Sequence, residues 1–159
     1  MQIHVVAVGK VKESYLREGI TEYLRRLSGF CSIRITEFPE SRMKDNPCFS
    51  EITAACLHEG NHLLKAAEPA GLLIALDPKG LSFSSEDFAK KFKKWEIEGP
   101  HQIAILIGGP HGLSEEIRNR ADLLISLSSM TFPHQMVRLI LMEQIYRAYT
   151  INKGLPYHR

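Results

Sequence analysis

The chain has 159 residues, of which 44% are hydrophobic and 24% are charged, and its formal net charge is +2. This length predicts a single domain, residues 1–159, with a sizeable core. The small net charge does not by itself indicate nucleic-acid binding, which would need a local basic patch. No apolar run approaches the roughly 20 residues that cross a bilayer, and the N-terminus lacks a signal-peptide pattern, so we expect a cytoplasmic protein without membrane attachment. Three cysteines without a Cys-x-x-Cys pair argue against a disulfide framework and a zinc ribbon.

Strand and helix patterns alternate along the whole chain. Apolar runs or alternation predict strands at residues 3–8, 31–37, 71–76, 103–107 and 123–127. Helical spacing predicts helices at residues 13–27, 50–67, 114–120 and 135–151, and one more that begins at Ser84. We expect a long loop at residues 38–50 and a turn at residues 77–80. The alternation predicts the α/β class, with a largely parallel five-stranded sheet flanked by helices.

A glycine turn follows the fourth expected strand, in the sequence Ile107-Gly-Gly-Pro-His-Gly-Leu-Ser114. Gly108 and Gly109 allow a sharp turn, and Ser114 can cap the next helix. Because parallel sheets bind ligands beyond the carboxyl ends of their strands, this turn is a candidate binding site. It matches neither the dinucleotide nor the phosphate-loop motif, and Pro110 removes a backbone donor, which argues against a phosphate cradle. A turn with a purely structural role is the alternative.

His58, Glu59 and His62 match the His-Glu-x-x-His pattern, in which two histidines bind zinc and the glutamate activates water. Gly60 weakens the helix that this pattern needs, and no third ligand follows at the spacing of extended zinc-protease motifs. We therefore expect no metal and interpret the pattern as a solvated helix face. A zinc hydrolase is the alternative enzyme hypothesis, and it predicts stoichiometric zinc.

The C-terminal part of the chain is locally basic, and its last side chains can make several kinds of contact. From Ser128 onward, four Lys or Arg residues stand against one acid, Glu143. The last three residues, Tyr157, His158 and Arg159, are suited to stacking, proton exchange and phosphate contact. A tail that is docked only for packing is the alternative, since chain ends are sometimes tied down.

Several stretches together resemble one known family. They are Leu106-Ile-Gly-Gly-Pro-His-Gly-Leu113, Leu127-Ser-Ser-Met-Thr-Phe-Pro-His134, Arg138, Glu143-Gln-Ile-Tyr-Arg-Ala148 and Pro156-Tyr-His-Arg159. In these motifs the sequence resembles the RlmH family, SPOUT-superfamily methyltransferases that modify a pseudouridine of large-subunit ribosomal RNA. The likeness runs from Gln2 to Arg159. It implies an α/β fold with a C-terminal trefoil knot, which general topology rules alone would argue against. It also implies a homodimer that acts on 23S ribosomal RNA in the assembled ribosome.

The resemblance implies S-adenosyl-L-methionine as the methyl donor. The residues that it implies for cofactor binding are Leu76, Gly108, Leu127, Ser128, Ser129, Met130, Thr131 and Phe132. The chemistry of these positions agrees, because strand ends and a loop of small residues offer an apolar slot with backbone donors and acceptors.

Methyl transfer to N3 of pseudouridine requires a positioned nucleophile and removal of its proton. In the tail, His158 is suited to take that proton, Tyr157 to stack on or orient the base, and Arg159 to hold a phosphate. We expect these three residues to be catalytic. Arg138 is expected to contact RNA or the partner subunit, and Arg159 is a second candidate RNA contact. The noncatalytic alternative is a ribosome-associated module whose tail binds RNA and whose glycine turn is structural.

Overall fold

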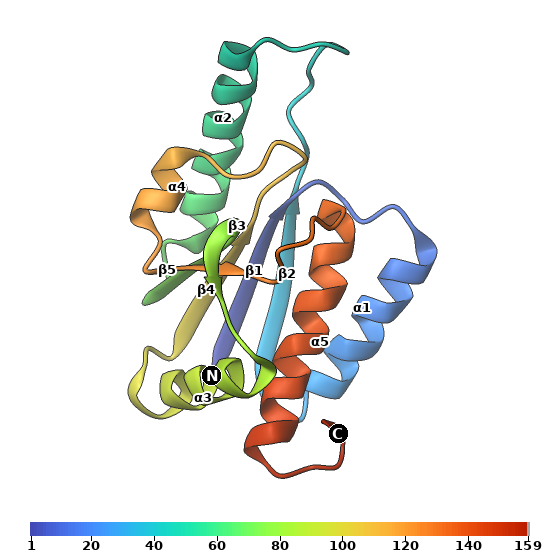
Figure 1. Ribbon diagram of the computed structural model, residues 1–159, viewed down its shortest axis with the longest axis vertical. Coiled ribbons are helices and arrows are strands. Elements are labelled where there is room, and N and C mark those ends of the chain that lie inside the picture. Colours follow the sequence, from blue (N-terminus) through green and yellow to red (C-terminus); the bar gives the residue numbers. More distant parts are fainter. Residues whose placement is uncertain (159) are drawn as a thin grey trace.

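A five-stranded parallel sheet forms the centre of the computed structural model, which describes residues 1–158 (Figure 1). Its strands are β1 (Gln2–Val8), β2 (Ser32–Phe38), β3 (Leu72–Ser82), β4 (Gln102–Ile107) and β5 (Leu123–Ser126), in the order β2-β1-β4-β3-β5. All neighbouring strands run parallel. The α/β class and the five-stranded sheet predicted from the sequence are confirmed.

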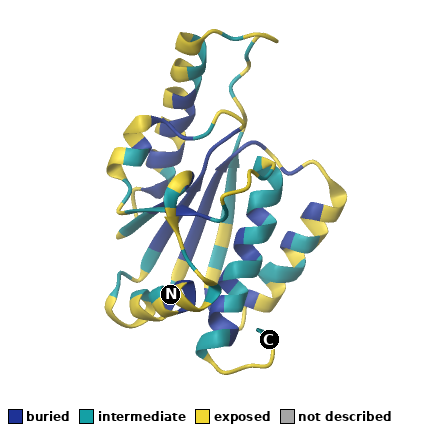
Figure 2. Ribbon diagram, in the orientation of Figure 1, coloured by how far each residue is buried: buried dark blue, intermediate teal, exposed yellow. Residues whose placement is uncertain are grey.

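Five helices cover the two faces of the sheet within the described residues. They are α1 (Ser14–Leu27), α2 (Phe49–Ala67), α3 (Ser85–Glu98), α4 (Glu115–Arg120) and α5 (His134–Asn152). The first, third and fifth pack on one face, and α2 and α4 pack on the other (Figure 1). Val5 of β1 faces the first layer and Val6 the second. Figure 2 shows the central strands buried on both faces, which explains their continuous apolar sequences.

Serine side chains cap the first turns of two helices, and a glycine lets two other helices pack closely. The Ser84 side chain accepts a hydrogen bond from Asp87 N at 3.0 Å and caps α3. The α1 and α5 helices approach closely at Gly19, where a Cβ atom would lie 2.9 Å from Leu139 Cδ1. Ser114 caps α4 in the same way as Ser84 caps α3. No helix within residues 1–158 is long and apolar enough to span a bilayer.

The third strand is longer than predicted. It continues past Leu76 through residues 77–80 with a shift in register, and Ile125 of β5 pairs with both Leu76 and Leu81. The predicted turn at residues 77–80 is wrong, because the backbone there crosses β5 instead of reversing direction. Gly80 permits this crossing, since a Cβ atom at that position would lie 2.6 Å from the backbone of β5.

Candidate functional site

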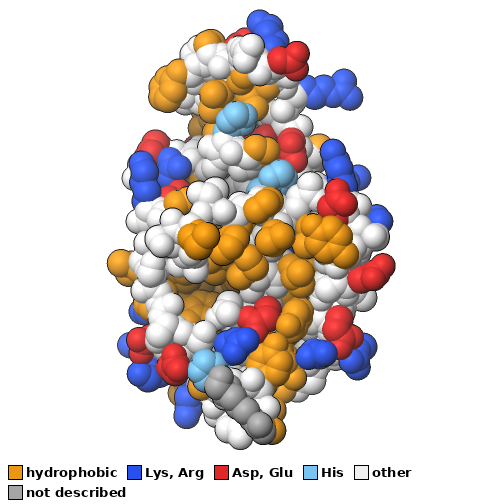
Figure 3. Space-filling view, turned by 45° about the vertical axis from the view of Figure 1, so that its right-hand side comes forward, with side chains coloured by type: hydrophobic (Ala, Val, Ile, Leu, Met, Phe, Trp, Pro, Cys, Tyr) orange, Lys and Arg blue, Asp and Glu red, His pale blue; other side chains and the backbone are white. Residues whose placement is uncertain are grey.

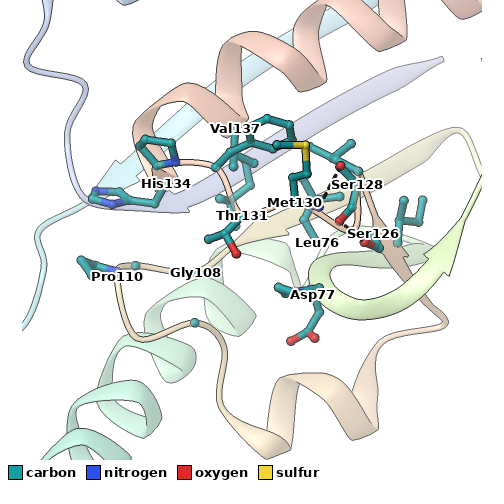
Figure 4. A pocket seen from close by; sticks show the side chains of 18 residues that line it. Leu76, Asp77, Gly108, Pro110, Ser126, Ser128, Met130, Thr131, His134 and Val137 are labelled. Carbon is teal, nitrogen blue, oxygen red and sulfur yellow. Dashed lines mark hydrogen bonds between the residues drawn. The ribbon is translucent and has the colours of Figure 1, made fainter.

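A cavity of about 390 Å³ opens at the carboxyl edge of the sheet. Three segments form its wall: the end of the regular part of β3, the glycine turn after β4, and the loop between β5 and α5 (Figure 4). Its volume lies within the range of small-molecule sites, roughly 300–1,000 Å³. Its position beyond the strand ends is the one at which parallel-sheet proteins bind ligands.

All but one of the residues that were predicted to bind the cofactor lie around this cavity. Leu76, Gly108, Leu127, Ser128, Met130, Thr131 and Phe132 line the cavity, whereas Ser129 does not. Two serine hydroxyl groups make local hydrogen bonds that shape the loop after β5. Ser126 Oγ donates to Ser128 O at 2.9 Å, and Ser128 Oγ accepts from Met130 N at 3.0 Å. The loop is therefore shaped within a single chain. That these residues bind a cofactor stays a prediction.

The glycine turn needs its glycines for its own geometry. Gly112 has a φ of 82°, which glycine adopts without strain, and its N–H donates to Gly109 O at 3.0 Å. A Cβ atom on Gly108 would lie 2.6 Å from the Gly112 backbone. A side chain at either position would therefore displace the cavity wall.

Glu59 of α2 is buried and packs against the glycine turn. Its Oε1 accepts from Ser41 N at 2.7 Å, and its Oε2 lies 3.5 Å from where a Cβ on Gly109 would be. The rings of His58 and His62 meet edge to face, 4.8 Å apart. Within residues 1–158, no three His, Cys, Asp or Glu side chains are grouped to hold a metal ion. Glu59 thus has a structural role, which corrects the solvated-face interpretation for this residue and argues against the zinc hydrolase.

Asp77 is a buried acid in the cavity wall that the sequence analysis missed. Its Oδ2 accepts from Arg118 Nε at 2.7 Å, and its Oδ1 accepts from Lys79 N at 2.8 Å. Burial alone would raise the pKa of Asp77, but these hydrogen bonds and the charge of Arg118 hold it below its ordinary value. The acid joins the middle of β3 to α4. It was overlooked because Asp-Pro-Lys-Gly is a typical turn sequence, and only the continuation of β3 places Asp77 at the site.

Arg138 is fully buried, so the prediction that it contacts RNA or a partner subunit is wrong. Its Nη2 donates to Val8 O at 2.5 Å and to Gly9 O at 2.7 Å, and its Nη1 lies 3.6 Å from Glu37 Oε1. Burial lowers the pKa of Arg138, while the charges of Glu37 and Glu40 oppose that change. The guanidinium therefore joins the end of β1 to α5, and its role in this chain is structural.

His134, the first residue of α5, lies at the rim of the cavity near Pro110 (Figure 4). Its Nε2 is 3.1 Å from Glu40 Oε1. Gly9, with a φ of 82°, lies against this pair, and a Cβ there would be 2.5 Å from Glu40 Oε1 and 3.1 Å from His134 Nε2. No sequence pattern indicates the pairing of His134 with Glu40, because the two residues are 94 positions apart in the chain.

Tyr157 packs on the helical layer and does not line the cavity. Its hydroxyl lies 3.0 Å from the Tyr23 hydroxyl and donates to Glu143 Oε1 at 3.1 Å, and the Arg147 guanidinium lies 5.0 Å from its ring centre. Burial, the Tyr23 contact and the Glu143 charge raise the pKa of Tyr157 above its ordinary value. Tyr157 is therefore a protonated group that is held in place.

His158 is engaged at both ring nitrogens. Arg147 Nη1 lies 3.1 Å from Nδ1, and Nε2 lies 2.9 Å from Glu86 Oε1. At 1.5 Å per residue, about 20 Å of helix separates Arg147 from His134 at the cavity. Arg159, the third residue predicted to be catalytic, lies outside the described residues. The structure thus does not bring Tyr157 and His158 to the cavity of their own chain.

Several known proteins are similar to this chain in sequence or in fold. The family described as "Predicted SPOUT methyltransferase" matches residues 1–158. The Ribosomal RNA large subunit methyltransferase H of Heliobacterium modesticaldum is 44% identical over 160 residues, which cover 100% of this chain and 99% of the relative. Its namesake in Acetivibrio thermocellus is 43% identical over 159 residues and is matched over 100% of both chains. In fold, the chain is similar to a probable methylase family protein from Haemophilus influenzae Rd KW20, with a TM-score of 0.58, 13% identity, and coverage of 99% of this chain and 70% of that one. This chain belongs to the SPOUT methyltransferase family.

Proposed function

We propose that this protein transfers a methyl group from S-adenosyl-L-methionine to N3 of a pseudouridine in 23S ribosomal RNA. One observation carries the proposal: the glycine turn and residues 127–132 meet at one cavity, in a chain whose full-length relatives are named as methyltransferases of large-subunit ribosomal RNA. The target atom and the assembled ribosome as substrate follow from the resemblance to the RlmH family. The protein would act in the cytoplasm, where ribosomes are found, and as a single domain.

The cavity suits this methyl donor. Leu76, Ile107 and Ile125 supply an apolar surface for an aromatic base, and the strand ends and the 127–132 loop supply backbone donors and acceptors. Asp77 in the wall is already paired with Arg118, so the cavity presents no unpaired acid from that position. When bound, the donor supplies a methyl group activated by a positive sulfur. The chain contributes a fixed orientation and a site shielded from water.

A second copy of the chain would complete the site. Met136, Leu139 and Ile140 of α5 are only half-buried in one chain, although other residues of the same helix form core. Figure 3 shows hydrophobic side chains gathered on the face that contains α1 and α5. A helix that is apolar on all sides is normally covered, and an exposed apolar patch normally marks an interface. The proposed homodimer would cover this face.

The dimer also accounts for the position of the tail. Tyr157 and His158 are far along α5 from the cavity of their own chain, so they would act at the cavity of the partner. There Tyr157 would orient the target base and Arg159 would hold a phosphate. Both residues, and the catalytic role of the tail as a whole, are part of the proposal.

The C-terminal trefoil knot is a further part of the proposal. The close crossing of β3 and β5 at Gly80 supports it, because the chain after β5 leaves from beside this crossing to enter α5. The knot would hold the 127–132 loop, and with it the cavity, in one arrangement.

Ribosomes from cells that lack this gene provide the test. They are incubated with the purified protein and S-adenosyl-L-methionine, and their digested RNA is analysed by mass spectrometry. We expect one pseudouridine of 23S ribosomal RNA to gain a methyl group at N3, and only when both protein and cofactor are present. Ribosomes that bind the protein and gain no methyl group would favour the noncatalytic module instead.

A further inference from the structure

We infer that His134, oriented by Glu40, is the group that takes the proton from N3 of the target base. The inference rests on the proposed function, and it moves this step from the tail to the cavity wall. His134 and His158 are the two candidates for the proton acceptor. His158 has both ring nitrogens engaged, by Arg147 and by Glu86, so it has no nitrogen available to accept a proton without losing a contact.

His134 has the arrangement that a proton acceptor needs. Its Nε2 lies 3.1 Å from Glu40 Oε1, and since a carboxylate can only accept, Nε2 carries the hydrogen. That leaves the Nδ1 lone pair available, and Nδ1 makes no hydrogen bond to any residue in the range 1–158. The side chain is 21% exposed and lines the cavity, so it can be reached from the site. The Glu40 carboxylate orients the ring as the third group of a catalytic triad does.

The surroundings fix this pair in place. Gly9 has no side chain, and this leaves room for Glu40 and His134 to meet next to its backbone. A Cβ atom on Gly9 would overlap the Glu40 carboxylate. Arg138, one turn further along α5, binds Val8 O and Gly9 O and so holds that backbone against the same helix. The imidazole pairs with Glu40 from the loop after β2, and Arg138 of the same helix pairs with Glu37 of β2.

The N3–H proton passes to His134 Nδ1 while the N3 lone pair forms the bond to the methyl carbon. The bond from methyl carbon to sulfur breaks, and its electron pair stays on sulfur. The imidazolium that results is stabilised by the Glu40 carboxylate, and its proton then passes to water.

Two variants and one control test the assignment on ribosomes that lack the modification. We expect His134→Gln and His134→Ala to lower kcat by about 10²- to 10⁴-fold, the usual contribution of a general base. Their affinity for S-adenosyl-L-methionine, measured by calorimetry, should stay at the wild-type value. Added imidazole should restore part of the activity of His134→Ala. The control is His101→Gln, an exposed histidine just before β4, which should leave kcat unchanged.

Nitrogen NMR of the labelled free protein gives a readout that does not depend on activity. In the wild type the His134 ring should show hydrogen on Nε2 alone, and Glu40→Ala should populate both tautomers. Wild-type kcat in His134→Gln would overturn the inference, and so would a loss that imidazole does not restore or hydrogen on Nδ1 in the wild type. These failures would leave the proposed function standing, because that function fails only if the wild-type protein itself does not methylate.

Discussion

The cavity and the C-terminal tail are built in opposite ways. The cavity is shaped by backbone: glycines at a tight turn, a strand that crosses its neighbour, and a loop folded by its own hydroxyl groups. The tail is held by side chains, with Tyr157 bound to Glu143, and His158 bound to Arg147 and Glu86. A backbone-built cavity is ready for a ligand in a single chain. In the proposed homodimer, α5 of one chain would lie against the other chain, so the same helix would form the interface and bring the tail to the cavity of the partner.

Deleting residues 157–159 should have the largest effect. We expect methylation to fall by more than about 10³-fold, because the groups that orient the base are lost, while cofactor affinity stays unchanged. Ribosome methylation and calorimetry measure the two quantities. Leu155→Ala, an exposed position in the same segment, serves as the control and should remain active. Full activity after the deletion would refute any role of the tail.

Arg138→Met tests the structural assignment of the buried arginine. It removes the hydrogen bonds to Val8 O and Gly9 O and leaves Glu37 without its charged partner, so we expect the free energy of unfolding to fall by about 3–5 kcal/mol. Chemical denaturation measures it. The matched control is Arg120→Met, whose pair with Glu116 is exposed and should contribute at most about 1 kcal/mol. Unchanged stability in Arg138→Met would show that the contacts of this guanidinium do not hold the fold together.

Gly108→Val tests the backbone-built cavity. The added side chain would meet the Gly112 backbone, and overpacking of this kind typically costs about 1–3 kcal/mol. If that strain displaces the turn, cofactor affinity should fall by roughly 5- to 100-fold, which calorimetry with S-adenosyl-L-methionine would detect. At Gly29, where a Cβ would meet nothing within 4 Å, substitution by alanine should leave affinity unchanged. Equal affinities in the two variants would show that the turn does not form the binding surface.

The smallest expected effect is a pH-dependent one, at Asp77. Its pKa is lower in the folded chain than in the unfolded chain, so its contribution to stability is full above the unfolded value of about 3.9 and is lost as the pH falls through the folded value. Asp77→Asn should lower stability at neutral pH by about 1.5–3 kcal/mol, the usual contribution of a charge-assisted hydrogen bond. It should also flatten the loss of stability below pH 4. Parallel acid-unfolding profiles of the two proteins would contradict the pairing with Arg118.

Periodicity was sufficient to predict the five strands and five helices, because continuous apolar runs and helical spacing reflect burial directly. It failed at residues 77–80, where Asp-Pro-Lys-Gly has turn chemistry and yet the crossing of β5 keeps the chain extended. Arg138 was misassigned because a charged residue is expected at the surface, and nothing in its neighbourhood indicates that it binds the end of β1. The pairing of His134 with Glu40 joins the first residue of α5 to the loop after β2, and these two meet only in the folded chain.

The proposal that the tail of one chain acts at the cavity of the other is tested most directly by combining two impaired variants. One is Gly108→Val, with an altered cavity and an intact tail, and the other lacks residues 157–159 and keeps an intact cavity. They are produced together with different tags, and dimers that carry both tags are purified. Each such dimer has one cavity and one tail intact on opposite chains. At a concentration of S-adenosyl-L-methionine that fills the intact cavity and leaves the Gly108→Val cavity mostly empty, we expect about half of the wild-type methylation of ribosomes, while each variant alone is nearly inactive. Mixed dimers as inactive as their parents would show that the tail does not act at the cavity of its partner.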